Sequence, residues 1–286
     1  MKTEIKHKLL LTALLLLLAV GVPILLNAQT QVTMLCGDNG SQVTGTATPL
    51  NLTGNVYVHS QGTGSNGAVI EVPIGLGNAT RTFSVQNSNA EADLTVSGAI
   101  SGTPGIVKLE NGNLKFGAGN IYQDATTVSG GMLQLGASGA VPANPFIMNG
   151  GTFSTGNPGF SEAAGTLVLT ENSTIELGTG SHTLSFAASD AVAWTSGKML
   201  TINGWQGNWE CMEPGTAGRI FIGTDETGLT ADQLNQIQFY DGSDYFSAIF
   251  LPDGELIAIN NDTHAPTITC PDPVTVVIND GCSASG

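Results

Sequence analysis

The chain has 286 residues, of which 41% are hydrophobic and only 11% charged, so it can bury a sizeable core under a polar, mostly uncharged surface. A net charge of −15 with only eight basic residues argues against binding to nucleic acids or anionic membranes, which depends on clustered Lys and Arg. The 38 glycines argue against long helices and favour short strands joined by tight turns.

The N-terminus has the pattern of a secretory signal peptide, in which lysines precede an apolar run that ends near small residues. The residues of this pattern are Lys2, Lys6, Lys8, the run 9–20, Pro23 and Ala28. We expect residues 1–28 to be removed by cleavage between Ala28 and Gln29, which makes the protein secreted or exposed at the cell surface. The alternative is an uncleaved anchor, because the apolar stretch extended to Leu26 approaches the length that spans a bilayer.

One small unit recurs from about residue 55 to 258: an apolar residue, any residue, and a second apolar residue, bounded by Gly, Asn, Ser or Thr. Side chains alternate between the two faces of a strand, so each unit predicts a short strand with its outer residues inward and its middle residue outward. The units are 56–58, 70–72, 83–85, 94–96, 107–109, 114–116, 133–135, 167–169, 175–177, 184–186, 200–202, 220–222 and 237–239.

The spacing of the units indicates a repeat. The segments 111–117, 130–136 and 150–156 resemble one another, and their central apolar positions are Leu114, Leu133 and Phe153. A period of about 20 residues is typical of a solenoid, in which no coil can bury its own apolar face and the coils stack. At about 20 to 25 residues per coil, we expect roughly eight to ten coils.

The segments 94–109 and 120–136 resemble the autotransporter-associated β-strand repeat. The resemblance covers residues 93–156 well and continues loosely to 258, with a departure at 123–125, where the family has a Gly-rich turn. It implies a right-handed parallel β-helix of the kind found in passengers of secreted or surface proteins. We therefore divide the body into a β segment with the first coils, 29–92, and a repeat region, 93–258.

The repeat region is expected to end in a cap. Thr230 and Gln233 have the spacing of a capping box, which predicts a helix from Ala231 to about Gln236. Strands are expected around 238–240, 248–250 and 254–257. A stack needs such an element, because the last coil otherwise presents an open strand edge.

The tail consists of a linker, 259–264, and the segment 265–286, which resembles the opening of a hyalin-repeat domain, an immunoglobulin-like sandwich. A sandwich takes about 100 residues, so this segment is either the start of a domain that continues in a longer protein, which we favour, or an isolated first strand. The resemblance implies that Cys270 and Cys282 are joined in the complete domain. Cys36 and Cys211 are left without an assigned partner, and no Cys or His spacing indicates a structural metal site.

Carboxylates at outward or loop positions are the candidate catalytic groups: Glu71, Glu110, Glu171, Glu176, Asp124 and Asp190. A glycosidase needs two carboxylates about 5 to 10 Å apart, and these residues do not cluster at one coil position. A lyase needs a basic residue at the site, and the body has five scattered ones. Enzymatic activity is therefore the weaker hypothesis.

Three further groups of residues have a functional and a structural interpretation. The histidines His59, His182 and His264 are interpreted as surface or turn residues. The tryptophans Trp194, Trp205 and Trp209 can form a sugar-stacking patch, but packing in the core or the cap is favoured. The acidic segments 241–244 and 253–255 can hold calcium, but turns are favoured because they lack the spacing of a known calcium loop.

The sequence thus predicts an all-β protein, a right-handed parallel β-helix with a C-terminal cap and an incomplete β-sandwich strand after it. The predicted function is that of a non-catalytic extracellular structural or adhesive module, a β-helical stalk without cofactors or metal ions. Extracellular glycans or surface proteins are its expected partners. The alternative is a carbohydrate-active β-helix enzyme, either a polysaccharide lyase or a glycosidase.

Overall fold

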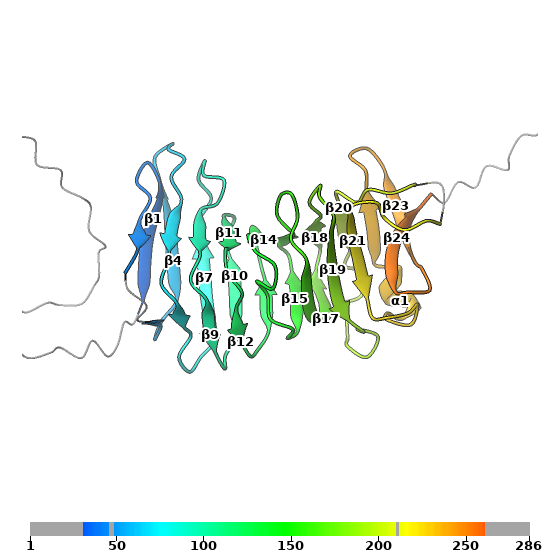
Figure 1. Ribbon diagram of the computed structural model, residues 1–286, viewed down its shortest axis with the longest axis horizontal. Coiled ribbons are helices and arrows are strands. Elements are labelled where there is room, and N and C mark those ends of the chain that lie inside the picture. The colour runs from blue at the N-terminus through cyan, green and yellow to red at the C-terminus, as the bar shows by residue number, and fades with distance from the viewer. Residues whose placement is uncertain (1–30, 46–48, 210–211, 261–286) are drawn as a thin grey trace, which may run out of the picture.

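A computed structural model describes residues 31–45, 49–209 and 212–260. These residues form an elongated stack of short strands that run across its long axis (Figure 1). The predicted signal peptide, the linker and the hyalin-like segment with Cys270 and Cys282 lie outside the described residues, as do Cys211 and His264.

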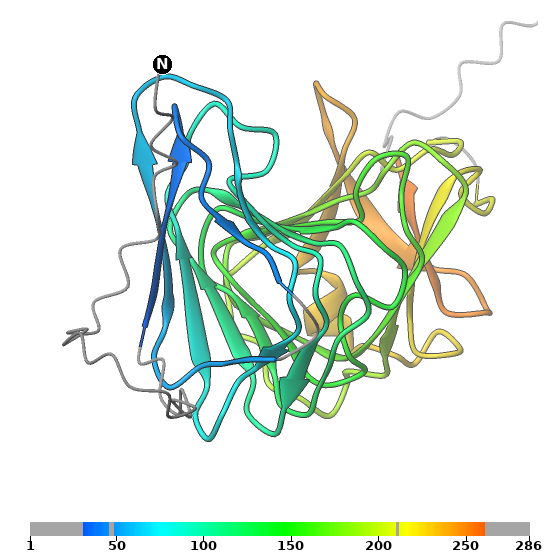
Figure 2. The ribbon, with the colours of Figure 1, turned by 60° about the vertical axis from the view of Figure 1, so that its left-hand side comes forward.

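The stack is a parallel β-helix of about 7 turns, so the predicted all-β solenoid is confirmed. The strands of successive turns lie in three rows (Figures 1 and 2). The first row holds β1 (Val32–Gly37), β4 (Val56–Gln61), β7 (Arg81–Val85), β10 (Ile106–Leu109), β13 (Thr126–Val128), β15 (Phe146–Asn149) and the second half of β17 (Glu162–Glu171).

The second row holds β2 (Gln42–Val43), β5 (Ala68–Ile70), β8 (Leu94–Val96), β11 (Asn113–Phe116), β14 (Met132–Leu135), β16 (Thr152–Ser154), β18 (Ser173–Glu176), β20 (Leu200–Asn203) and β22 (Ile237–Tyr240). The third row holds β3 (Leu50–Asn51), β6 (Ile74–Gly75), β9 (Ile100–Gly102) and β12 (Ile121–Tyr122), and it resumes with the first half of β17, β19 (His182–Ala187) and β21 (Gly218–Ile222).

The predicted repeat coincides with the strand register. Leu114 pairs with Leu133, and Leu133 pairs with Phe153, so the repeated positions belong to adjacent coils. Coils nearer the ends are longer. This is shown by paired residues that lie further apart in the chain, such as Val56 with Phe83 and Ile202 with Phe239. A period of about 20 residues therefore holds only in the middle of the stack, while the nine strands of the second row lie within the predicted eight to ten coils.

The inward residues of the units form one continuous core that follows the axis. Leu133 and Leu135 are fully buried, and Gln134 between them is partly exposed, as predicted. A stack of this kind stabilises each coil through its neighbours, because every inward side chain is covered by those of the coils above and below.

The unit 107–109 is predicted in the wrong register. Lys108 points inward and is 0% exposed, whereas Leu109 is 40% exposed. Ile106 and Val107 are both apolar, so alternation alone allows two choices of inward residues. The pairing of Lys108 with the buried Phe83 of β7 selects Ile106 and Lys108 as the inward set.

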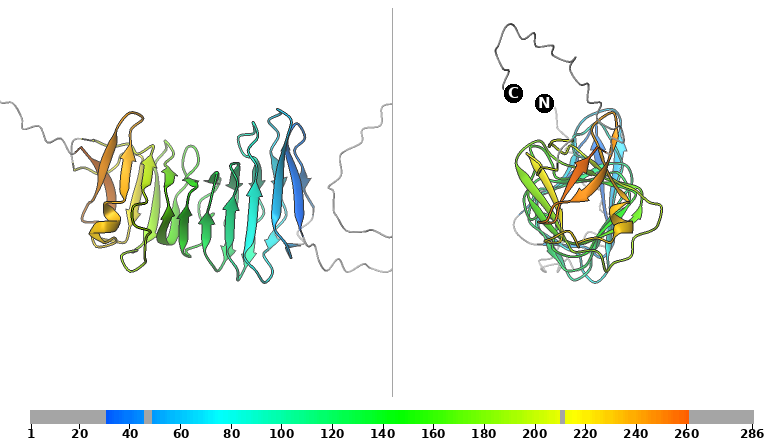
Figure 3. Two further views of the ribbon diagram at one scale, coloured as in Figure 1. Left: turned by 180° about the vertical axis from the view of Figure 1, so that it is seen from behind. Right: turned by 90° about the vertical axis from the view of Figure 1, so that its right-hand side faces the viewer.

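The C-terminal end has the predicted cap. Helix α1 (Ala231–Leu234) begins with the capping box of Thr230 and Gln233, and it ends at Leu234 rather than at Gln236 as expected. After β22 the pairing becomes antiparallel through β23 (Tyr245–Phe250) and β24 (Glu255–Ile259), which returns to β21. Figure 3 shows this hairpin and the helix across the end of the stack.

Side chains fix the cap to the last coils. The buried Glu255 accepts a hydrogen bond from Gly215 N at 2.8 Å and forms an ion pair with Arg219. Trp205, which is 3% exposed, packs edge-on against Trp209 and Phe239, at ring-centroid distances of 4.9 and 5.5 Å. The segment between β20 and β21, which makes this coil long, therefore supplies the core of the cap.

The N-terminal end is protected by local hydrogen bonds. Strand β1 has one partner, β4, among the described strands. Leu35 of β1 donates its N–H to Ser41 Oγ at 2.9 Å and accepts a bond from Ser41 N at 2.9 Å. Ser41 thus satisfies part of the free edge, which limits the pairing of β1 with another strand.

Candidate functional site

An open groove of about 740 Å³ lies on the outer face of the second row. Its lining comes from the strands β11, β14, β16 and β18 and from the corners on either side of them. The outward side chains in the groove are Asn113, Met132, Gln134, Thr152, Ser154, Thr174 and Glu176. The polar ones combine amides and hydroxyls, which can both donate and accept hydrogen bonds.

Strand register places these side chains in two parallel lines along the axis. One line joins Gln134, Ser154 and Glu176, and the other joins Met132, Thr152 and Thr174. Because parallel strands stack about 4.8 Å apart, successive side chains of a line repeat at that spacing. The groove therefore presents a periodic set of polar groups.

Glycines shape the corner at which the first row turns into the second. Gly131 has φ of 55°, and a Cβ there would lie 2.3 Å from Gly112 O. A Cβ on Gly151 would lie 2.6 Å from Val128 Cγ1. The paired glycines of the repeat are therefore needed where the backbones of adjacent coils approach each other.

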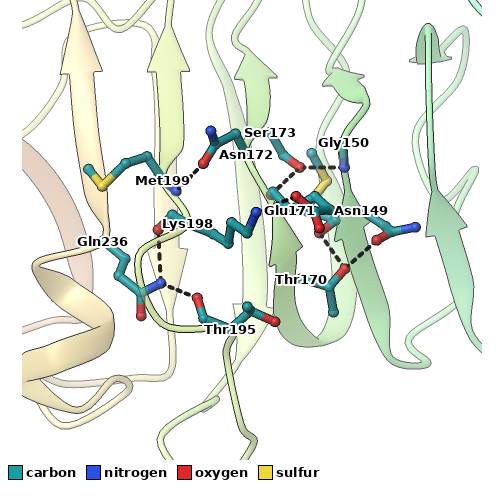
Figure 4. A network of polar contacts seen from close by, with 11 residues as sticks. Asn149, Gly150, Thr170, Glu171, Asn172, Ser173, Thr195, Lys198, Met199 and Gln236 are labelled. Atoms are coloured by element: carbon teal, nitrogen blue, oxygen red, sulfur yellow. Dashed lines mark hydrogen bonds and ion pairs between the residues drawn. The ribbon is translucent and has the colours of Figure 1, made fainter.

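Further along the same corner, side chains tie neighbouring coils together (Figure 4). Thr170 Oγ1 donates to Asn149 Oδ1 at 2.7 Å, and Met199 N donates to Asn172 Oδ1 at 2.9 Å. Gly150 N donates to Ser173 Oγ at 2.9 Å. These bonds stiffen one wall of the groove, because Gly150, Asn172 and Ser173 also line it.

The same network continues toward the cap. Lys198 forms an ion pair with Glu171 at 2.6 Å, and Gln236 Nε2 donates to the carbonyl oxygens of Thr195 and Lys198. Figure 4 shows that these contacts cross from one coil to the next. Glu171, a candidate catalytic acid, is thus part of a structural ion pair.

Three acidic residues line the groove: Glu91, Asp93 and Glu176. Asp93 is fully buried and accepts bonds from Ser88 N, Ser88 Oγ and Asn113 N at 2.5 to 2.7 Å. Its carboxylate therefore fixes the backbone of the segment before β8 to the start of β11. Glu176 Oε1 accepts a bond from Asn203 Nδ2 at 2.8 Å. Of these three acids, only Glu176 was predicted from the sequence as a candidate; Glu91 and Asp93 were not.

Glu91 and Glu176 are far apart along the groove. Glu91 precedes β8, and Glu176 ends β18, which lies four strand steps further along the second row. At about 4.8 Å per step, the two positions are separated by about 19 Å along the axis. The remaining predicted candidates, Glu71, Glu110, Asp124 and Asp190, are exposed and lie outside this groove.

Two inward polar residues, which the sequence analysis placed outward or did not consider, carry shifted pKa values. Burial lowers the pKa of Lys108 to about 8, although Asp93 and Glu110 act in the opposite direction. Lys108 Nζ donates to the carbonyl oxygens of Leu109, Glu110 and Gly130 at 2.8 to 3.1 Å.

Glu162 is the second such residue. Burial raises its pKa, while it accepts bonds from Val141 N at 2.9 Å and Ala163 N at 3.0 Å. Both side chains satisfy backbone groups at corners where the strand ladder is interrupted, so they have a structural role.

The interpretation of His182 as a surface or turn residue is wrong. His182 begins β19 and is 5% exposed. Its Nδ1 lies 2.7 Å from Gly180 O, which can only accept, and its Nε2 lies 2.8 Å from Thr155 Oγ1. The ring therefore bridges two coils from the inside. His59 is exposed, as expected.

The tryptophans do not form one patch. Trp205 and Trp209 pack in the cap, where Trp209 also contacts Phe246 at 4.6 Å, in agreement with the packing interpretation. Trp194 donates its Nε1–H to Leu167 O at 2.8 Å and borders a second hollow of about 490 Å³. Asp190 and Asp232 also line this smaller hollow.

The acidic segments near the C-terminus form turns, as favoured. Asp241 Oδ1 accepts bonds from Ser243 N and Asp244 N at 2.8 Å, and these bonds lower its pKa. Asp253 accepts from Glu255 N and pairs with Arg219. No group of three or more His, Cys, Asp or Glu side chains within the described ranges is arranged to hold a metal ion.

Comparison of the chain with known protein families, curated proteins and solved structures finds no match. The fold and the groove therefore define the class, a parallel β-helical solenoid with a polar outer groove. None of the helices in the described part of the chain combines the length and apolar character needed to cross a membrane.

Proposed function

We propose that this protein is a non-catalytic extracellular structural or adhesive module, a β-helical stalk of a secreted or cell-surface protein. The observation that carries the proposal is the continuity of strand pairing in the second row, from β2 to β22, up to the capping hairpin. The eight strand steps from β2 to β22 extend roughly 38 Å at the usual spacing of about 4.8 Å. It holds the groups at its two ends at a fixed distance, as a stalk requires.

The alternative is a carbohydrate-active enzyme that uses the groove. A glycosidase places its two carboxylates about 5 to 10 Å apart, whereas Glu91 and Glu176 are separated by about 19 Å along the axis. Asp93, the acid nearest to Glu91 in sequence, has both oxygens occupied by corner hydrogen bonds. The described lining residues include no Lys, Arg or His to serve as a lyase base. These distances and contacts favour the stalk.

Activity is tested by incubating the full chain with acidic and neutral polysaccharides and measuring new reducing ends or unsaturated products. We expect no turnover. Glu176→Gln is the matched variant, because it removes the groove carboxylate that projects from a strand and retains the side-chain shape. Turnover by the wild-type chain that is lost in folded Glu176→Gln would replace the stalk with an enzyme.

Export is tested separately by sequencing the N-terminus of the chain released from cells that express it. We expect the mature chain to begin at Gln29. A chain that keeps Met1 and sediments with membranes would support the uncleaved anchor, and a chain retained inside the cell would contradict the extracellular assignment.

A further inference from the structure

We propose that the outer groove of the second row binds an uncharged polysaccharide chain, laid along the axis so that successive sugar rings contact successive coils. This inference goes beyond the stalk and can fail while the stalk stands. It rests on the dimensions, hydrogen-bonding groups, charge and rigidity of the groove.

The dimensions fit an extended chain. The lining runs from Asn87, between β7 and β8, to Thr179, after β18, and so crosses the four strand steps from β8 to β18. The steps of about 4.8 Å match the advance of one ring along an extended glycan. The groove therefore accommodates about four rings, one for each coil crossed. A compact ligand would contact only part of this length.

The hydrogen-bonding groups suit sugar hydroxyls. The hydroxyls of Thr152 and Thr174 point outward, and neither makes a hydrogen bond to a described residue. Gln134 accepts from Asn113 Nδ2 through Oε1, which leaves its Nε2 as a donor for a ligand. Groups of this kind fix the position of a ligand through paired donors and acceptors.

The charge of the groove selects against acidic polysaccharides. Glu91 and Glu176 face an anionic chain, while Lys and Arg do not occur among the described lining residues. Like charges in an interface oppose binding. An uncharged chain meets no such repulsion and can accept hydrogen bonds from the amides and donate to the carboxylates.

The composition of the groove is unsuited to a protein partner. Protein interfaces have an apolar centre enriched in aromatic residues, Met and Arg. The described lining contains no aromatic residue, and Met132 and Leu177 are its large apolar side chains. Without a ring to stack on the sugars, affinity rests on hydrogen bonds alone and is expected to be modest.

The wall of the groove is already ordered. The inter-coil bonds from Gly150 to Ser173 and from Met199 to Asn172 hold the corner backbone in place. Binding then costs little conformational entropy of the protein, because the strands and corners keep their positions when the ligand binds. A rigid, periodic surface suits a periodic polymer.

The test is isothermal titration of the full chain with neutral gluco-, manno-, xylo- and chito-oligosaccharides of increasing length, with oligogalacturonate and oligoalginate as acidic counterparts. We expect at least one neutral series to bind, with affinity that rises to about four rings and then levels off. The acidic series should bind more weakly than the neutral one.

The variants Thr152→Val and Thr174→Val remove one groove hydroxyl each and keep the β-branched shape. Each should weaken binding by about fivefold, which corresponds to a hydrogen bond of about 1 kcal/mol. Thr127→Val is the matched control, because Thr127 is an equally half-buried outward residue of β13 in the first row, outside the groove. Thr174→Trp fills the groove and should abolish binding while the melting temperature stays near that of the wild type.

The proposal is overturned if no neutral series binds, if acidic chains bind more tightly, or if Thr127→Val weakens binding as much as Thr174→Val. Binding that survives Thr174→Trp would also overturn it. None of these results bears on the reducing-end assay or on the N-terminal sequence, so the stalk is judged independently.

Discussion

The central coils and the C-terminal coils follow the same strand register with different chain lengths. From β8 to β18 in the second row, one coil takes about 20 residues, as between the paired Leu114 and Leu133. From β18 to β22 the coils are longer, yet Ile175, Ile202 and Phe239 still align. The inward residues set the register, and extra residues leave the stack as loops, because lengthening a loop costs little free energy.

The two regions use their corners differently. Short central coils need glycines such as Gly131 and Gly151 where backbones approach closely, and their uniform length leaves an even groove. The long coil between β20 and β21 brings Trp205 and Trp209 over the end of the core, where they contact Phe239 and Phe246. Coils of uniform length thus form the continuous outer groove, whereas the long coil supplies the side chains that cover the end of the core.

The largest expected effect tests the cap. Trp205→Ala removes a side chain that is 3% exposed and contacts Trp209 and Phe239. The cavity should lower the free energy of unfolding by about 3 to 5 kcal/mol. Chemical denaturation measures this, and size-exclusion chromatography should show association, because loss of Trp205 loosens the hairpin whose strand β23 covers the edge of β22. A stable monomeric variant would show that the hairpin alone closes the stack.

The second effect tests the central core. Leu133→Ala or Leu135→Ala removes a fully buried side chain between stacked coils. Each should cost about 2 to 5 kcal/mol, and hydrogen exchange should accelerate in the adjacent strands as well. Glu71→Gln, at an exposed position after β5, is the control and should change stability by no more than about 0.5 kcal/mol. Equal losses in Leu133→Ala and Glu71→Gln would contradict the inward assignment.

A third, pH-dependent effect tests the buried lysine of the central region. Burial lowers the pKa of Lys108 to about 8, below the value of about 10.4 expected in the unfolded chain. Between these values the unfolded state holds the extra proton, so stability should rise with pH, by at most about 1.4 kcal/mol per unit. Below pH 8 the lysine is protonated in both the folded and the unfolded state, so it no longer makes stability depend on pH.

The measurement is the denaturation midpoint of the wild type and Lys108→Met from pH 7 to about 10. The rise should be smaller in the variant. Higher pH is avoided, because burial raises the pKa of Tyr122 and its ionisation would destabilise the fold. A wild type and a variant with the same pH dependence would show that Lys108 is not desolvated.

The smallest effect concerns the helix of the cap. Thr230→Ala removes the side-chain oxygen that accepts a bond from Gln233 N at 3.2 Å. Loss of an N-cap costs about 1 kcal/mol, and thermal denaturation should show it. Thr230→Ser keeps the oxygen and should restore most of the loss. If Thr230→Ser is as unstable as Thr230→Ala, packing of the methyl group matters more than the cap.

Much of the fold could be predicted because its signals are local. Alternation identified the inward pair Leu133 and Leu135, the even spacing of the repeated segments identified adjacent coils, and Thr230 with Gln233 identified the helix. The candidate site was largely missed: of its three acids, only Glu176 was singled out. Its walls come from residues as distant as Glu91 and Thr179, which no short pattern connects.

By itself, the sequence determined the strand units, the stacking period and the cap, because side-chain alternation and capping act between neighbouring residues. Only the tertiary structure decided that Lys108 and His182 lie inside and that Trp205 closes the stack. It also decided which outward polar residues meet in one groove. These outcomes depend on the alignment of one coil with the next, which sets whether a polar side chain finds a partner inside or faces the solvent.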